Sequence, residues 1–476
     1  MQLAIIGYPP ASLVFITPAP VSLPGGTCHS ATVQAQRALA PIAPALVASD
    51  TPVALTTTPT GGARFYSDST CSTTTSFATI PAGASTATFW VKPLTGGPQT
   101  IAATASFGTA SQTLTILPIV RRATCSFDAP TASDGGSFIF DLSTTCTFTP
   151  AVQDLNHALV FSQAIASANH DGASQARCFL SSNTTVTCYR SNGDSAAPVH
   201  VQVAEIPQGL QVRHFTAASC SAAARVNLSP AVDPSKTFVL KTLENVDPFK
   251  TPNMTTARLH PDGGQVELLG GSCSGYALQV AEWDGVKVTR FDPDGGLAPG
   301  SLDVTWTGFS AASNARVLLV QPQLKEIPGR TPSTCDFAVR GWLPSPSSLA
   351  VRRGGGTADG GCELSAVEPL VLERIDLGPH AVVQEQTVSL GMGQSTATVQ
   401  LRPVDPTRTV VFAGTQLGAG QSTGELEAVS PVIDPQPTAN TATAIFLLTS
   451  ADTVTVTRAS TNARATFTFY VVELDP

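Results

Sequence analysis

Charged side chains are scarce in this chain. Asp, Glu, Lys and Arg make up 13% of its 476 residues, and the formal net charge is -8. Proteins that bind a phosphate backbone usually carry a basic surface, so the composition argues against a nucleic-acid partner. Long apolar runs are missing as well. None approaches the roughly 20 residues of a membrane-spanning helix, which argues against a membrane span.

Helical periodicity and the motifs of catalysis are also scarce. Apolar residues at helical spacing are nearly confined to an Ala-rich stretch near Ala164. The chain has no His-Glu-x-x-His motif and no Gly-rich phosphate loop, and its seven histidines are scattered. The stretch from Gly271 to Gly275 matches a nucleophile elbow with Cys273 as nucleophile, but it lies between two predicted strands instead of between a strand and a helix. We therefore expect no enzymatic activity and no cofactor.

Three Asp-Gly pairs could supply oxygen ligands to calcium, which needs about six to eight of them. The aspartates are Asp262, Asp294 and Asp359. Because the same dipeptide is typical of tight hairpin turns, we expect turns at these positions and no metal.

Internal repetition is the strongest positive signal. The phrase Asp233-Pro-Ser-Lys-Thr-Phe-Val-Leu returns as Asp405-Pro-Thr-Arg-Thr-Val-Val, and a looser copy begins at Asp154. A second phrase closes each unit, with the pattern Val-x-Glu in three units and Ala366-Val-Glu368 in the other, and its glutamates recur every 77 to 105 residues. Such periods indicate an array of similar units. The closing glutamates are Glu205, Glu282, Glu368 and Glu473.

A short hairpin precedes three of the closing phrases, and its second strand ends in arginine at Arg190, Arg353 and Arg458. Opposite charges on neighbouring strands stabilise a sheet by a few tenths to about 1 kcal/mol. We therefore interpret the recurring Glu and Arg residues as framework ion pairs. The alternative is a ligand site that is repeated in each unit.

Between the phrases, apolar and polar residues alternate with period two, and Pro, Gly, Asn and Asp separate the alternating runs. This pattern predicts half-buried strands joined by turns. We predict an all-β fold, arranged as a linear array of about five β-sandwich domains. The predicted segments are 1–11 (an orphan strand and Pro linker), 12–120 (a first sandwich of different sequence), and four related repeats at 121–206, 207–283, 284–372 and 373–476.

Each predicted domain holds an even number of the ten cysteines: two in the first sandwich, four, two and two in the next three repeats, and none in the last. Even counts indicate disulfides within domains, which persist in oxidising compartments, so we expect a secreted or cell-surface protein. Cys178 and Cys188 flank a hairpin and could pair across it, which leaves Cys125 for Cys146. The alternative is ten buried thiols. The other cysteines are Cys28 and Cys71, Cys220 and Cys273, and Cys335 and Cys362.

The first predicted domain has a recognisable order of strands. It opens with Ser12-Leu-Val-Phe-Ile-Thr-Pro, and an Ile80-Pro-Ala-Gly edge leads into an alternating strand that contains Trp90. This stretch resembles the bacterial Ig-like domains of invasin- and adhesin-type surface arrays. The four later units resemble the tandem β-sandwich repeats of large exported proteins of Gram-negative bacteria. The resemblance implies a spacer, adhesive or assembly role outside the cell.

The N-terminal residues predict a strand without a domain. Met1 to Pro10 hold a short apolar run that lacks the basic segment of a signal peptide. Either these residues belong to a longer protein, or they form an assembly strand that pairs with a sheet edge of a neighbouring copy. The residues of this predicted strand are Leu3, Ala4, Ile5, Ile6 and Tyr8.

The far end of the chain raises a matching question. Earlier closing phrases continue into a further strand, as at residues 285–290, whereas the last phrase ends at Pro476. If that further strand belongs to the same sandwich, the last unit has an empty edge, which recruits other strands and predicts head-to-tail filaments. If the strand instead opens the following unit, the array ends on a unit boundary.

We therefore predict a non-enzymatic extracellular structural protein, a surface fibre or filament subunit whose partner is another copy or a cell-surface molecule. The main alternative is a carbohydrate-binding adhesin, and a phage or secretion-apparatus fibre is a further one. Sugar sites usually need exposed aromatic platforms. Trp306 and Trp342 are the candidates, because Trp90 and Trp283 occupy positions that look buried.

Overall fold

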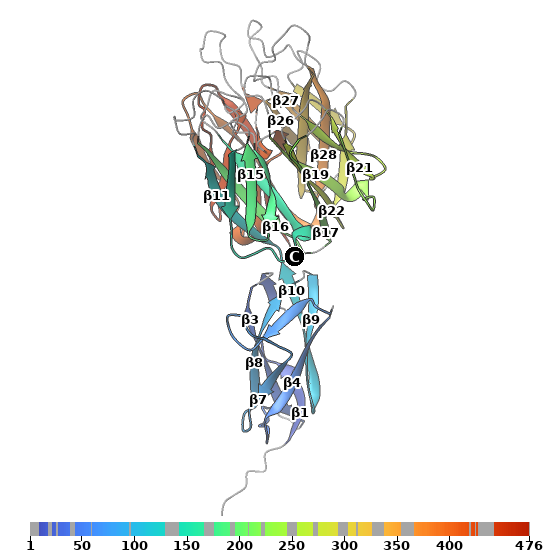
Figure 1. Ribbon diagram of the computed structural model, residues 1–476, viewed down its shortest axis with the longest axis vertical. Coiled ribbons are helices and arrows are strands. Elements are labelled where there is room, and N and C mark those ends of the chain that lie inside the picture. The colour runs from blue at the N-terminus through green and yellow to red at the C-terminus, as the bar shows by residue number, and fades with distance from the viewer. Residues whose placement is uncertain are drawn as a thin grey trace, which may run out of the picture.

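The computed structural model consists of a stalk and a head (Figure 1). Strands between residues 10 and 117 form the stalk, and strands between residues 119 and 474 form the head. The structure describes residues 9–17, 21–24, 27–38, 43–58, 60–94, 97–128, 142–165, 176–190, 196–207, 209–219, 224–244, 255–269, 275–293, 303–310, 313–325, 338–353, 366–417, 420–423, 425–426 and 442–475.

The stalk is a sandwich of two five-stranded sheets. Side chains of one face of each strand, such as Val33, Phe89 and Ile101, fill a core that belongs to the stalk alone. One sheet has the order β1 (Pro10–Phe15), β3 (His29–Arg37), β8 (Thr86–Pro93), β5 (Ala63–Tyr66), β6 (Thr74–Thr75). The other has the order β2 (Val21–Pro24), β10 (Gly108–Leu117), β9 (Gly97–Ala105), β4 (Thr51–Thr58), β7 (Phe77–Ile80).

The head contains four copies of one sandwich, which we call repeats 1 to 4. We name the six strands of each repeat A to F in chain order. Strands A, F and C form an inner sheet, and strands B, E and D form an outer sheet, with F and E in the middle. All these pairs are antiparallel, as alternating strands joined by turns require.

The strands A to F of each repeat are as follows. Repeat 1 has β11 (Ile119–Phe127), β12 (Leu142–Thr147), β13 (Ala158–Ala164), β14 (Arg177–Ser182), β15 (Thr185–Arg190) and β16 (Ala197–Glu205). Repeat 2 has β17 (Leu210–Ala217), β18 (Arg225–Asn227), β19 (Thr237–Glu244), β20 (Thr256–Leu259), β21 (Gln265–Leu269) and β22 (Gly275–Trp283).

Repeat 3 has β23 (Lys287–Phe291), β24 (Asp303–Thr307), β25 (Arg316–Lys325), β26 (Val339–Ser345), β27 (Ser348–Arg353) and β28 (Ala366–Asp376). Repeat 4 has β29 (Ala381–Leu390), β30 (Thr396–Gln400), β31 (Thr409–Ala413), β35 (Ile445–Ser450), β36 (Thr453–Thr457) and β37 (Ala465–Leu474). It also carries an inserted hairpin of β32 (Thr415–Leu417) and β33 (Gly420–Thr423), followed by β34 (Glu425–Leu426).

The repeated Asp phrase forms the turn between strands B and C. Asp154, Asp233 and Asp405 each cap a single 3-10 turn, because the carboxylate accepts a hydrogen bond from the backbone N–H two residues later. A local acceptor of this kind satisfies an amide that the turn leaves unpaired. The phrase therefore recurs because repeats 1, 2 and 4 use the same turn before strand C.

The pairing of strands decides where each repeat begins. The strand that follows a closing phrase is strand A of the next repeat, since β17 pairs with β22 and β23 pairs with β28. In repeat 4, β37 lies between β29 and β31. The closing strand thus has partners on both sides, and the empty edge that one of the two predicted phasings requires is not found at β37.

The repeats lie side by side in the head (Figure 1). Their inner sheets contribute to one shared hydrophobic core, with members such as Phe161, Phe238, Leu319 and Phe412 from repeats 1 to 4 in turn. The all-β fold of tandem sandwiches is confirmed. The end-to-end arrangement of the repeats is corrected, because buried side chains of all four inner sheets pack against one another in this core.

Candidate functional site

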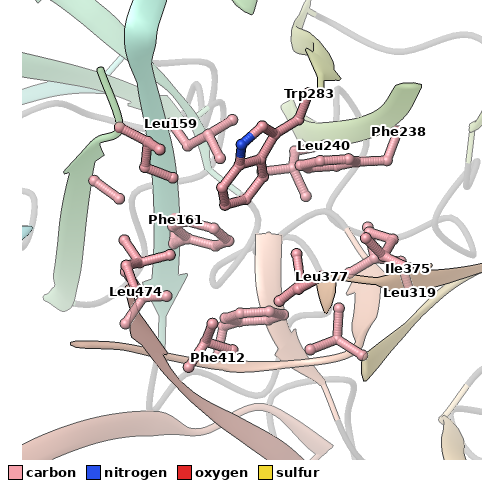
Figure 2. A pocket seen from close by; sticks show the side chains of 15 residues that line it. Leu159, Phe161, Phe238, Leu240, Trp283, Leu319, Ile375, Leu377, Phe412 and Leu474 are labelled. Atoms are coloured by element: carbon pink, nitrogen blue, oxygen red, sulfur yellow. The ribbon is translucent and has the colours of Figure 1, made fainter. Parts of the chain in front are cut away.

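The centre of the head is the point where all four inner sheets meet (Figure 2). It encloses an apolar cavity of about 40 Å³. The lining follows the repeat, because strand C of each repeat supplies two side chains and the end of strand F supplies one or two more. The residues that line it are Leu159, Phe161, Ala204, Ile206, Phe238, Leu240, Trp283, Val317, Leu319, Ile375, Leu377, Val410, Phe412, Val472 and Leu474.

This cavity is a packing centre. Phe161 and Phe412 stack with ring centroids 4.8 Å apart, and the indole of Trp283 closes one side against Leu240 (Figure 2). A cavity lined by apolar side chains stays dry even when it is large enough for a water molecule. The space is also far smaller than the roughly 300–1,000 Å³ of a small-molecule site.

A ring of polar contacts surrounds the apolar centre. The residue of strand F three positions before its closing acid reaches the backbone of strand C in the preceding repeat. Gln279 of repeat 2 accepts from Val160 N at 2.6 Å and donates to Val160 O at 2.7 Å. Gln202 of repeat 1 binds Val411 of repeat 4 in the same way, at 3.0 and 2.5 Å.

Repeats 3 and 4 use other side chains at the same position. Glu373 of repeat 3 accepts from Val239 N of repeat 2 at 3.1 Å. Burial raises the pKa of Glu373, and Arg290 opposes this rise. Tyr470 of repeat 4 lies against the backbone of Leu318 in repeat 3, and burial raises its pKa. The contacts therefore run from 1 to 4, 4 to 3, 3 to 2 and 2 to 1, which is a closed ring.

Strand A adds a second layer to the ring. Arg122 of repeat 1 donates to Pro406 O at 2.7 Å and to Thr409 O, both at the B–C turn of repeat 4. Arg290 of repeat 3 makes the equivalent bonds to Pro234 O and Thr237 O of repeat 2.

The other two repeats vary this second layer. His214 of repeat 2 lies 3.0 Å from Leu155 O of repeat 1. Glu385 of repeat 4 instead accepts from Leu343 N of repeat 3. Each repeat thus contacts the backbone of the preceding repeat through two side chains, one on strand A and one on strand F, that are paired in the register of the inner sheet.

A third layer joins strand C of each repeat to the preceding repeat, through strand D in three of the four cases. Gln163 accepts from Phe446 N at 2.8 Å, and Gln321 accepts from Ala257 N at 3.0 Å. Thr242 accepts from Cys178 N at 3.0 Å. In repeat 4 the equivalent residue is Gly414, whose carbonyl accepts from Val320 N at 2.9 Å.

The hairpin of β32 and β33 breaks the fourfold pattern. It belongs to repeat 4 but contacts the other three repeats. Thr415 pairs with Val320 of repeat 3, Gln416 accepts from Lys241 N of repeat 2 at 2.9 Å, and Gln421 accepts from Ser162 N of repeat 1 at 3.3 Å. The hairpin therefore ties the inner strands together.

The predicted framework glutamates hold turns instead of pairing with the predicted arginines. Glu205 lies 2.7 Å from Arg121, both buried, and also accepts from Gln153 N and Asp154 N. Glu282 accepts from Asp233 N at 3.2 Å. In repeat 4, Glu473 lies 2.7 Å from Arg408, which belongs to the B–C turn. Each acid ties strand F to the B–C turn of its own repeat.

In repeat 3 a different residue stands in this register. Arg316 begins strand C and is paired with Asp376, just as Thr237 is paired with Glu282 in repeat 2. Asp376 accepts from Ser313 N at 2.9 Å. Glu368 lies eight residues earlier on β28, and its side chain is outside the described residues. The sequence pattern missed Asp376 because Arg-Ile-Asp does not match Val-x-Glu.

The three predicted arginines are almost fully buried in the outer sheets, at 0 to 1% exposure. Arg458 donates to the carbonyls of Gly391, Gln394 and Ala463, and burial lowers its pKa to about 10. Arg190 lies over the ring of Phe127, 4.6 Å from its centroid, and donates to Asp128 O. Arg353 occupies the last position of β27. The described contacts of Arg190 and Arg458 tie strand E to loops of the same repeat.

Three of the predicted disulfides are present. They join Cys28 to Cys71, Cys125 to Cys146 and Cys178 to Cys188. Each lies within one sandwich. In repeat 1, the Cys125–Cys146 disulfide joins the inner sheet to the outer sheet, and the Cys178–Cys188 disulfide joins neighbouring strands of the outer sheet. The other four cysteines, Cys220, Cys273, Cys335 and Cys362, lie outside the described residues, as do Leu3, Ala4, Ile5, Ile6 and Tyr8.

The tryptophans predicted as sugar platforms are half-buried. Trp342 has the guanidinium of Arg340 over its ring, 4.4 Å from the centroid. Trp306 packs edge to face against Phe291 at 5.2 Å. Trp283 is buried in the head core.

Among the described residues, no group of three His, Cys, Asp or Glu side chains is placed to hold a metal ion. In the same part of the chain, no helix is long and apolar enough to cross a membrane.

Comparison with known proteins finds no matching family model and no matching curated protein. Among solved structures, the C-terminal domain of the antigen I/II polypeptide BspA from Streptococcus agalactiae is 12% identical, with a TM-score of 0.11 over 41% of this chain and 88% of that chain. The C-terminal domain of AspA from Streptococcus pyogenes is 10% identical, with a TM-score of 0.12 over 41% and 89%.

A third similar structure is the titin fragment I67–I69, which is 10% identical with a TM-score of 0.12 over 59% of this chain and 91% of that chain. Superpositions with scores this low carry no argument about the fold or the function of this protein. The interpretation of the head therefore depends on its own geometry.

Proposed function

We propose that this chain is a non-enzymatic extracellular structural protein, a stalk-and-head component of a surface fibre or adhesin. The observation that carries the proposal is the closed ring of four sandwiches, which uses its repeated polar residues to join the repeats to one another. A repeated ligand site would leave those residues facing a pocket. Here Gln202, Gln279 and Glu373 are buried against neighbouring backbone.

The disulfides support an extracellular location. Cys28 and Cys71 close a loop across the stalk, and two more disulfides lie in repeat 1. Such bonds form and persist in oxidising compartments. An exported protein that must keep its shape without chaperones gains from crosslinks of this kind, since each restricts the unfolded chain.

Filament formation through the N-terminal strand is the finer part of the proposal. An extended segment pairs with an exposed sheet edge through backbone hydrogen bonds. The closing strand β37 has partners on both sides, so the acceptor has to be another edge. Strand β30 is an outer strand of its sheet, and its residues are exposed or half-exposed. We propose β30 as the acceptor for residues 3–8 of a second copy.

Negative-stain electron microscopy of the full chain, with and without residues 1–8, tests this proposal. This deletion leaves β1 intact, because β1 begins at Pro10. Stalk-and-head particles joined end to end, and separated by the deletion, are the expected result. Single particles in both samples contradict filament formation but keep the structural role. Turnover of a substrate class in an activity screen contradicts the non-enzymatic role.

Carbohydrate binding is the competing hypothesis. Trp342 is the aromatic side chain to test, because its half-buried ring already accommodates Arg340 on one face. A glycan array probed with the native chain and with Trp342→Ala decides the matter. Binding that disappears in the variant favours the adhesin, and absence of binding in both favours a structural component.

A further inference from the structure

One of the four ring contacts differs from the others in how the chain supports it. Repeats 1 and 2 are linked by residues 206–209, repeats 2 and 3 by residues 284–286, and repeats 3 and 4 by residues 377–380. Repeats 4 and 1 stand at opposite ends of the head sequence. No segment of chain connects them directly, so their contact, which we call the seam, is held by noncovalent interactions alone.

The seam uses the same contact as a linked pair of repeats. Gln202 binds both polar groups of Val411 across the seam, and Gln279 binds both polar groups of Val160 between the linked repeats 2 and 1. Val411 and Val160 are both the third residue of strand C. A contact between two different faces of a unit closes a ring or, if it fails to close, continues into further copies.

We propose that the seam is exchangeable between copies, so that repeat 4 of one chain closes onto repeat 1 of a second copy and the protein self-associates through its heads. This inference deepens the proposed structural function and names its partner, a second copy of this chain. The surface that repeat 1 offers consists of Arg122, Gln163 and Gln202 together with Phe161. The segment that occupies it is β31 of the other copy.

The exchange conserves the contacts of the head. A repeat 4 that moves to another chain makes there the bonds that it leaves, because both chains present the same repeat 1, repeat 3 and hairpin partners. The equilibrium between the closed monomer and the exchanged dimer then depends on the effective concentration within one chain and on the conformation of the link at residues 377–380. That link is short and turns at Gly378, where φ is +55°. Short links of this kind favour domain swapping.

Repeat 4 is a suitable unit of exchange because it carries its own core. Residues such as Leu390, Phe446 and Phe467 form a cluster within that sandwich. The hairpin of β32 and β33 is part of repeat 4, so Gln416 and Gln421 move with it and bind the new host. The same hairpin contacts repeats 1, 2 and 3, so it slows the opening of the seam.

A matched pair of variants of the full chain tests the exchange. Gln202→Ala removes the bidentate contact at the seam, and Gln279→Ala removes the equivalent contact between linked repeats. The purified monomer of each is incubated at high concentration below its unfolding temperature and sampled by size exclusion with light scattering. Both closed and exchanged seams lose the same contact in Gln202→Ala, so we expect faster dimer formation, by tenfold or more, at an unchanged final ratio.

Gln279→Ala is expected to form dimers at the rate of the native chain, because exchange of repeat 4 leaves the contact between repeats 1 and 2 in place. Equal acceleration by both variants overturns the assignment to repeat 4, and absence of dimers in every sample overturns the exchange. A second pair guards against misfolding of the first. Gln163→Ala weakens the seam, and Thr242→Val changes the equivalent position between repeats 2 and 1.

Electron microscopy of the dimers separates this proposal from strand addition. Exchange predicts dimers joined at their heads with both stalks free, and these dimers persist in a chain without residues 1–8. Particles that are joined through the N-terminal end of the stalk and separate on deletion of residues 1–8 overturn seam exchange while supporting the proposed filament.

Discussion

The stalk and the head solve the packing of a β-sandwich in two different ways. In the stalk, strands such as β4 and β8 alternate between buried and exposed residues, and the two sheets enclose a core of their own. In the head, strands β13, β19 and β31 are buried at every position. A strand that is buried on both faces needs a packing partner on each side, and the neighbouring repeats supply it.

The difference shows that a domain boundary in the sequence does not always separate units that unfold independently. The stalk has the contacts of an independent unit. Repeats 1, 2 and 4 also have cores between their own sheets, but all four repeats share a further core that none of them encloses alone. We therefore expect two unfolding transitions in the native chain, one for the stalk and one for the whole head. Differential scanning calorimetry with domain-specific reporters measures them.

Removal of a large side chain from the shared core gives the largest expected effect. Phe412→Ala loses the stacking with Phe161 and leaves a cavity where four sheets meet, which costs about 3–5 kcal/mol. The head transition is expected to shift downward as one unit, while the stalk transition keeps its midpoint. The control is Phe89→Ala in the stalk core, which is expected to move the stalk transition alone. Separate transitions for repeats 1 to 4 would contradict the shared core.

A comparison between two repeats gives the second effect. Arg121→Met leaves the buried carboxylate of Glu205 without its cation, and breaking a buried pair in this way costs about 3–5 kcal/mol. Lys236→Met removes the half-buried partner of Glu282, whose pair keeps about a quarter of each side chain in contact with solvent, and solvent screens such pairs. We expect a clear loss in denaturant unfolding for the first variant and little change for the second. Equal losses would show that the pair in repeat 2 is more than a surface contact.

The disulfide of the stalk gives a third, somewhat smaller effect. Cys28 and Cys71 are separated by 43 residues, and closing a loop of that length stabilises the folded state by about 4 kcal/mol on the chain-entropy model, which often overstates the effect. In the double variant Cys28→Ser, Cys71→Ser, chemical denaturation should report a less stable stalk and an unchanged head. A coupled loss in the head would contradict the independence of the two regions.

The smallest effect, at most about 1.4 kcal/mol per pH unit, is a pH dependence of the head. Lys241 is buried in repeat 2, its ammonium contacts Thr255 O, and burial lowers its pKa to about 7. Between pH 7 and the usual lysine value of 10.5, the unfolded state binds more protons than the folded state, so the free energy of unfolding rises with pH. Below pH 7 both states carry the proton, so Lys241 adds no pH dependence to the free energy of unfolding there. In Lys241→Met, the slope over this range should be lost.

That measurement compares denaturant curves of the native chain and the variant from pH 7 to pH 10. The stalk provides an internal reference, since both chains share it unchanged. If the two head curves stay parallel across the range, the ammonium of Lys241 is hydrated in the folded state. This outcome would place water inside the sandwich of repeat 2.

Local chemistry in the sequence was sufficient for several features. Alternation predicted the strands, the Asp-Pro phrase marked a turn that the carboxylates of Asp233 and Asp405 do cap, and the spacing around Cys178 and Cys188 predicted a crosslinked hairpin that is present. Each of these signals involves residues close together in the chain or on adjacent strands. The interactions that produce these features therefore need no contact with a distant part of the chain.

The ring was decided only by tertiary structure. The contact of Gln202 with Val411 joins residues 209 positions apart, and a glutamine in a strand carries no local sign of such a partner. One local signal of the ring is nevertheless present. Runs such as Ala158-Leu-Val-Phe and Thr409-Val-Val-Phe lack the polar half of an alternating strand, which indicates burial on both faces. The sequence thus determined sandwiches and turns, and the need to cover the second apolar face of each inner sheet decided that four of them close into a ring.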